Sequence, residues 1–150
     1  MRSWPTKMLL LTLSGCNGPL VPDVGAWVYT DDGLVETTCA DDLYRDPDAT
    51  FGVLSADAQG FVATDGEEFP CTLDGHDFTC PERRKIDLPV TGDTVVSWTV
   101  AVSGRFPDAH TMHGEQTFTI DCEGSLCGLD QAVLGYDLPC AYTVAFHATH

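Results

Sequence analysis

Basic residues are scarce in this 150-residue chain. It contains seven Lys and Arg against 23 Asp and Glu, which gives a formal net charge of −16 at pH 7. A surface of this sign repels phosphate backbones and anionic lipid headgroups, so we expect no nucleic-acid partner. The acidity does not indicate disorder, because 43% of the residues are hydrophobic and can build a core.

The chain also lacks a hydrophobic run long enough to cross a membrane as a helix. Such a helix needs roughly 20 apolar residues, whereas the apolar segment near the start, residues 8–13, is broken by Ser14 and Gly15. Arg2 and Lys7 precede this segment. Basic residues, a short apolar stretch and small residues therefore follow one another in the order of an export signal, which is removed from the mature protein.

The residues Leu13, Ser14, Gly15 and Cys16 resemble the lipobox of bacterial lipoproteins. The resemblance implies that residues 1–15 are cleaved off and that Cys16, carrying a diacylglyceryl group, becomes the first mature residue. Two or three acyl chains hold a protein durably at a bilayer, whereas one chain binds marginally. The next residue is Asn17, where an aspartate would be the retention signal. By resemblance to lipoprotein sorting in Gram-negative envelopes, Asn17 implies the outer membrane of the cell envelope. The alternative is an ordinary secretory signal, with Cys16 as a disulfide partner.

Seven cysteines are present, and an even six remain if Cys16 is lipidated. In an exported chain these six predict three disulfides. The six are Cys39, Cys71, Cys80, Cys122, Cys127 and Cys140. No CxxC pair occurs, so we expect neither a cysteine metal site nor another cofactor. Cys71 and Cys80 flank a predicted hairpin turn and should form one bridge. Of the three ways to pair the other four, we favour Cys127–Cys140 with Cys39–Cys122, because strand ends and loops should meet there.

Sustained helical periodicity is missing after residue 25, which excludes an all-α domain. Short alternating segments rich in Val, Thr and aromatics are separated by Gly, Asp and Pro instead. The strongest predicted strand is 94–104, which Arg105–Asp108 should end. A turn at Asp31–Gly33 is expected to join two strands into a hairpin, and a helical turn is expected near 131–134.

The pattern predicts an all-β fold, a single antiparallel barrel or sandwich of about eight to nine strands. Short connections favour up-and-down topology. The predicted domain covers residues 25–150, and residues 16–24 form an extended tether.

Gly25-Ala26-Trp27 is similar to the GxW motif of lipocalins and other calycins. The resemblance implies an eight-stranded barrel in which Trp27 closes one end, with an arginine packed over it; Arg105 is the only arginine late in the chain. Trp27 as a plain core residue is the alternative. A ligand cavity in such a barrel would be lined by Trp27, Trp98, Met112 and Phe118, unless these side chains simply fill the interior.

No recognised catalytic motif is present, so we expect neither catalytic residues nor an enzyme. Weaker candidate sites are a zinc or copper pair at His110 and His113, and a basic cluster in a turn at 83–85, Arg-Arg-Lys. A further candidate is an acidic calcium loop with Asp41, Asp42, Asp46 and Asp48. The expected function is a lipid-anchored envelope lipoprotein acting as a binding or structural module for a protein or small molecule. The alternatives are a lipocalin-like carrier of a small apolar ligand and, more remotely, a metal-dependent hydrolase.

Overall fold

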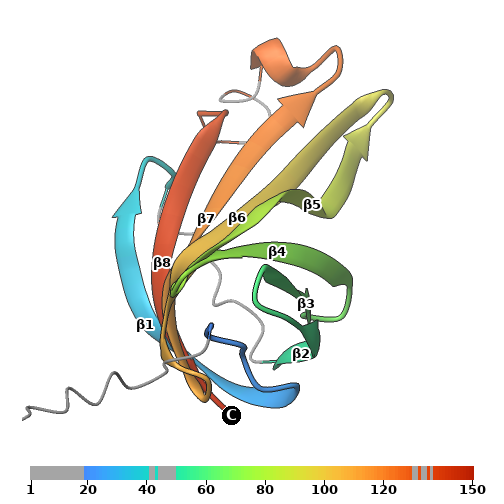
Figure 1. Cartoon of the computed structure of the whole chain (residues 1–150). Helices are drawn as coiled ribbons and strands as arrows, with labels where there is room; N and C mark the ends of the chain where they lie inside the picture. The colour runs from blue at the N-terminus through green and yellow to red at the C-terminus, as the bar shows by residue number, and fades with distance from the viewer. Residues whose placement is uncertain (1–18, 41–42, 44–49, 130–131, 133–134, 136) are drawn as a thin grey trace, which may run out of the picture.

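In the computed structural model, the described part of the chain folds into a closed antiparallel barrel (Figure 1). The structure describes residues 19–40, 43, 50–129, 132, 135 and 137–150. Its strands are β1 (Gly25–Thr37), β2 (Thr50–Ala56), β3 (Gly60–Thr64), β4 (Glu68–Asp74), β5 (Asp77–Thr91), β6 (Thr94–Asp108), β7 (Thr111–Glu123) and β8 (Cys140–Thr149). A 3-10 turn, η2 (Cys127–Leu129), follows β7. Each strand pairs with its neighbour in sequence, and β8 pairs with β1, which confirms the all-β prediction.

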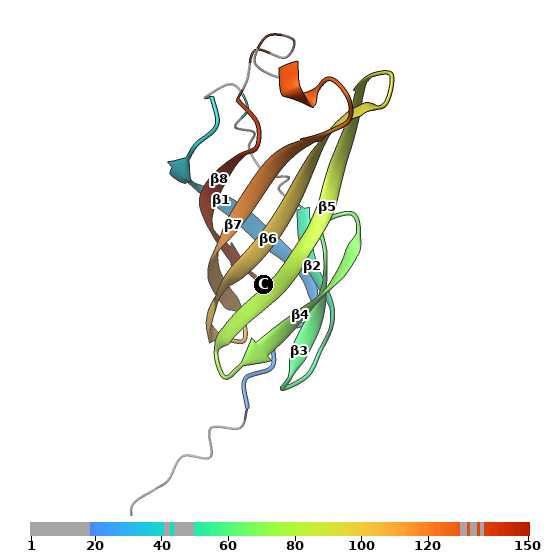
Figure 2. The same cartoon turned by 90° about the horizontal axis from the view of Figure 1, so that it is seen from above.

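The barrel wall is much taller on one side than on the other. Strands β5 and β6 contain 15 residues each and β7 contains 13, whereas β2, β3 and β4 contain seven, five and seven. Figures 1 and 2 show the long β5–β6 hairpin rising well beyond the short strands. The barrel therefore has a lower end, where the C-terminus lies, and an upper end formed by the tips of the long strands. No helix in the described residues is long and apolar enough to cross a membrane.

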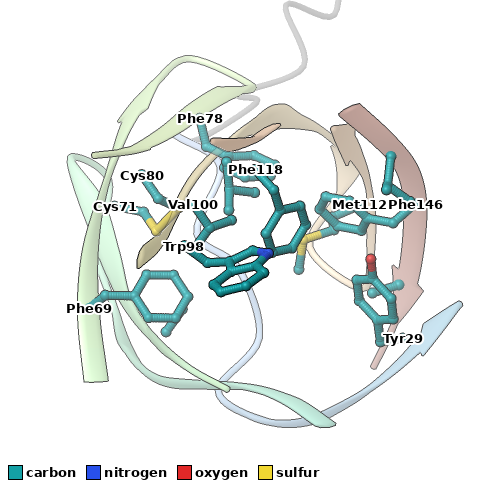
Figure 3. Packing of buried hydrophobic residues seen from close by; sticks show 14 of the residues in the cluster. Tyr29, Phe69, Cys71, Phe78, Cys80, Trp98, Val100, Met112, Phe118 and Phe146 are labelled. Atoms are coloured by element: carbon teal, nitrogen blue, oxygen red, sulfur yellow. A yellow bond between two sulfur atoms is a disulfide. The ribbon is translucent and has the colours of Figure 1, made fainter. Parts of the chain in front are cut away.

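Alternating side chains of the strands fill the barrel interior. Along β6, Val96, Trp98, Val100 and Val102 are all buried, as the predicted strand required. Inward side chains of the neighbouring strands meet them, and Phe118 stacks on Tyr142 with ring centroids 4.9 Å apart. Figure 3 shows Trp98, Val100 and Phe118 pointing into the middle of the ring of strands. The described interior holds a packed hydrophobic core.

Asp31–Gly33 does not form the predicted turn. β1 continues through it, and its register against β8 shifts between Asp31 and Gly33, as at a β-bulge. Gly33 has a positive φ of 105°, and its N–H donates to Asp31 Oδ1 at 2.6 Å. An Asp–Gly sequence suits a bulge as well as a turn, and here β8 pairs with β1 on both sides of it.

Two charged segments expected at strand ends lie inside strands. The basic cluster 83–85 belongs to β5, and β6 extends through Arg105 to Asp108. Register shifts on both sides of Arg84 bend β5 at this point. The bend half-buries Arg83 and Lys85, and their charges are compensated by Asp65 at 2.5 and 2.9 Å. The predicted helical turn near 131–134 lies largely outside the described residues.

All six cysteines after Cys16 form disulfides, but only one predicted pairing is confirmed. Cys71–Cys80 bridges β4 and β5 as expected. The predicted Cys127–Cys140 and Cys39–Cys122 pairs are wrong, because the structure joins Cys39 to Cys140 and Cys122 to Cys127. The reason is barrel closure: β8 begins at Cys140 beside the end of β1, which brings Cys39 opposite it.

Candidate functional site

A small apolar cavity opens at the upper end of the barrel, and we call it the apolar notch. Its volume is about 150 Å³. Its lining is Leu43, Leu88, Val90, Val96, Trp98, Ile120 and Leu138. The long strands β5, β6 and β7 supply five of these side chains, because only they extend beyond the short strands. The lining carries no polar surface, so the notch suits an apolar group.

Trp98 is the one lining residue with a polar group in its side chain. The indole is only 5% exposed, and its Nε1 has no hydrogen-bond partner among the described residues. A buried N–H without a partner costs free energy, on the order of 1–3 kcal/mol. Figure 3 shows the Trp98 ring near the centre of the ring of strands. The nitrogen itself has no exposed surface in the notch, whose lining is wholly apolar.

Three of the four residues expected to line a cavity, Trp98, Met112 and Phe118, belong to the same barrel core and lie inside the ring of strands in Figure 3. Trp98 lines the notch, but Met112 is fully buried and Phe118 is 8% exposed, both inside the packed core. Trp27 lies at the opposite, lower end. Phe118 stacks on Tyr142, so rings from neighbouring strands take up part of the interior among the described residues.

Trp27 is buried at the lower end, where the segment before β1, the β6–β7 turn and the end of β8 meet. Its ring packs edge-on against Phe106 at 5.9 Å between centroids, and its Nε1 donates to the backbone oxygen of Asp23 at 3.1 Å. His150 covers it with centroids 5.7 Å apart. Arg105 does not cover Trp27; it forms an exposed ion pair with Asp77 at 3.2 Å. A histidine thus stands where the calycin resemblance implied an arginine.

His110 and His113, a weaker candidate for a metal pair, have different neighbours. His113 lies across from His147 on β8 with ring centroids 6.2 Å apart, and His147 Nδ1 contacts both carboxylate oxygens of Asp32 at 2.8 and 2.9 Å. His110 instead contacts Asp23, with His150 beside them. The reason is that side chains alternate between the two faces of a strand, so residues three positions apart point to different faces.

The basic cluster is not a free positive patch. Arg83 lies over the Phe69 ring, 3.6 Å from its centroid, and pairs with Asp65. Burial alone would raise the pKa of Asp65, but the hydrogen bond from Lys85 and the charges of Arg83 and Lys85 outweigh it and hold that pKa below its ordinary value. Arg84 is exposed and pairs with acidic neighbours. The cluster is therefore occupied by the protein's own carboxylates.

Two sets of predicted residues lie outside the described part of the chain. They are the lipobox Leu13, Ser14, Gly15 and Cys16, and the acidic residues Asp41, Asp42, Asp46 and Asp48. Sequence reasoning missed Asp23 and His150, which contribute to the cluster at the lower end, and the two loop leucines of the notch. No local pattern marks Asp23 and His150, because they come together only where the two ends of the domain meet.

Comparison with protein-family models, curated proteins and solved structures finds no match to this chain. The functional interpretation therefore depends on the chemistry of the residues alone.

Proposed function

We propose that this protein is a lipid-anchored lipoprotein of the cell envelope whose barrel is a non-enzymatic binding module. The lipobox-like residues Leu13–Cys16 support the anchor. The observation that carries the proposal is that two features lie at opposite ends of the barrel. The segment before β1 is held at the lower end, where Asp23 N–H donates to Ala109 O at 2.9 Å, and the apolar notch lies at the upper end. An anchor at Cys16 would leave the notch facing away from the bilayer.

The filled interior supports a module over an enzyme or a bulk carrier. Ligand pockets for drug-sized molecules measure roughly 300–1,000 Å³, and the notch is about 150 Å³. The barrel gains its rigidity from the packed core and three disulfides. A rigid scaffold with a small apolar opening at its upper end suits contact with a side chain or a small ring.

The anchor is tested by the intact mass of the protein extracted from a bacterial membrane with detergent. We expect a chain that begins at Cys16 and carries two or three acyl chains. Cys16→Ser should abolish acylation and release the protein from the membrane fraction. Ser14→Ala keeps a small residue in the lipobox and should be processed normally. An unacylated mature chain, or one that retains residues 1–15, would contradict the proposal.

A second function, carriage of a small apolar ligand, is favoured by the wholly apolar lining of the notch, to which Trp98 contributes its ring. An apolar cavity of about 150 Å³ is large enough for a benzene-sized molecule. Acetophenone contains such a ring. We expect it to shift the indole N–H resonance of Trp98 in an NMR titration, because its ring would lie against the indole. The indole of Trp27 should not respond, because it lies at the lower end of the barrel.

Two leucines of nearly equal exposure provide the matched variants for this titration. Leu88 lines the notch and is 45% exposed, whereas Leu34 lies on β1 and is 44% exposed. Leu88→Asn should weaken acetophenone binding, and Leu34→Asn should not. The carrier hypothesis is wrong if the Trp98 resonance stays in place, or if the two variants behave alike.

A further inference from the structure

We propose that Asp23, His110 and His150 form a binding site for a divalent transition-metal ion such as Zn²⁺, at the lower end of the barrel. We call these three residues the terminal triad. Each offers one ligand atom, and the three atoms lie within 4.8 Å of one another. His150 Nδ1 is 3.4 Å from Asp23 Oδ2, and His110 Nδ1 contacts the same oxygen.

The ligand types and spacing suit this class of ion. Imidazole nitrogens and a carboxylate oxygen bind Zn²⁺ at about 2.0–2.2 Å, so a tetrahedral arrangement places its ligand atoms roughly 3.3–3.4 Å apart. The His150–Asp23 distance already has this value. The ion would separate His110 from Asp23 slightly and replace their direct contact. Solvent would complete the coordination, because His110 is 69% exposed.

Backbone hydrogen bonds hold the three ligands together before any ion binds. Asp23 N–H donates to Ala109 O at 2.9 Å, and His150 N–H donates to His110 O at 2.9 Å. The His110 N–H is bound by Asp108 Oδ1 at 2.8 Å. Each ligand residue is thus fixed by its own main chain. A preorganised site loses less conformational entropy on binding than ligands on free loops.

Packing against Trp27 positions the third ligand. The His150 ring lies against the Trp27 indole, and a Cβ on Gly25 would come within 2.6 Å of His150 Nε2. Gly25, with φ of 147°, therefore leaves the space that the imidazole occupies. His150 Nδ1 is turned toward the carboxylate as a result. The acidic surface of the chain also attracts cations generally.

The other histidines do not offer an equivalent site in the described residues. His147 Nδ1 is already within hydrogen-bond distance of the Asp32 carboxylate, and the His113 ring lies beside the His147 ring. His76 Nδ1 lies 2.6 Å from the backbone oxygen of Phe106. These residues therefore serve as internal controls. A metal bound by the terminal triad would join the segment before β1, the β6–β7 turn and the end of β8.

The site is tested by titrating ZnCl₂ into the full chain carrying Cys16→Ser, without a histidine tag, by calorimetry at pH 7.5. The substitution removes the thiol that could compete for zinc. We expect one Zn²⁺ per chain. His110→Ala and Asp23→Asn should each weaken binding by about tenfold or more, since changes even beyond the direct ligands cost roughly 10–100-fold. His113→Ala should bind zinc as the parent does.

Side-chain NMR signals provide a second readout. Zinc should move the imidazole resonances of His110 and His150 and leave those of His113 and His147 in place. Asp23→Asn keeps the shape of the side chain, so an unchanged amide spectrum shows that its loss of binding is not a loss of fold. The proposal is overturned if no saturable binding occurs, if the triad variants bind as well as the parent, or if His113→Ala loses affinity equally.

Discussion

Removal of the Cys39–Cys140 disulfide should destabilise the barrel more than removal of either other disulfide. This bridge joins the chain just beyond β1 to the first residue of β8, so it fastens the pair of strands that closes the barrel. The three bridges enclose very different lengths of chain. Their sequence separations are 101 residues for Cys39–Cys140, nine for Cys71–Cys80 and five for Cys122–Cys127.

The expected magnitudes come from the entropy that each bridge removes from the unfolded chain. The loop-entropy relation gives about 4.7 kcal/mol at 25 °C for the first bridge, about 2.6 for the second and about 2.1 for the third. Lost packing adds to the first two, since all four of their cysteines are buried. We therefore expect a gap of roughly 2 kcal/mol or more between the Cys39–Cys140 bridge and the Cys122–Cys127 bridge.

Urea unfolding of three paired-alanine variants at 25 °C measures this order directly. Each variant replaces both cysteines of one bridge by alanine in the Cys16→Ser background, so that no free thiol exchanges with the remaining bridges. If the Cys39–Cys140 variant is unfolded in buffer while the other two remain folded, the order still holds. Equal losses for all three, or the largest loss for Cys122–Cys127, would refute the reasoning that the β1–β8 closure is the most stabilising cross-link.

Two further variants test local features against matched controls. The pKa of Asp65 is lowered in the folded protein. Its ionised carboxylate therefore stabilises the fold above the unfolded-state pKa of about 3.9, and this stabilisation is lost as the pH falls through the lower folded-state pKa. Asp65→Asn should flatten the acid end of the stability curve in urea unfolding and cost about 3 kcal/mol at pH 7, because it leaves two half-buried cations without their partner. Asp77→Asn, in an exposed pair, should cost under about 1 kcal/mol. Equal effects would contradict this. A Cβ on Gly104 would clash with the backbone oxygen of His113, so Gly104→Ala should lower stability by about 3 kcal/mol or prevent folding. Gly128→Ala, with open space around it, should be nearly neutral by thermal melting, and a neutral Gly104→Ala would show that the strands can separate there.

The fold class could be read from the sequence because strand alternation is a local property. The β6 pattern of Val96, Trp98, Val100 and Val102 marks one buried face without any knowledge of its neighbours. The Cys71–Cys80 bridge was predictable for the same reason, since a tight turn sets the register of its own hairpin. Strand ends were less predictable, as the burial of Arg83 shows. That residue is tolerated within β5 only because Asp65, from a different hairpin, supplies the compensating charge.

Features that depend on the β1–β8 closure could not be predicted from local patterns. The Cys39–Cys140 bridge, the continuation of β1 through Asp31–Gly33, and the meeting of Asp23 with His150 all require the first and last strands to be adjacent. Alternation specifies which face of a strand is buried but not which distant strand lies beside it. The size of an interior cavity could not be predicted from the sequence for a related reason. The volume left inside a barrel depends on how rings from neighbouring strands interlock, and Phe118 and Tyr142 stack in the space.

The length of the barrel, together with the proposed anchor, limits which ligands can reach the notch. β6 has 15 residues, so at about 3.3 Å per residue and a tilt near 40° it rises roughly 35–40 Å along the barrel axis. Asp23 is bound at the lower end, and the seven residue steps from Cys16 to Asp23 span at most about 25 Å. A barrel standing upright on a lipidated Cys16 would therefore hold the notch well beyond the headgroups. Its ligand would come from the aqueous side or from a partner surface, because a lipid could reach the notch only after leaving the bilayer.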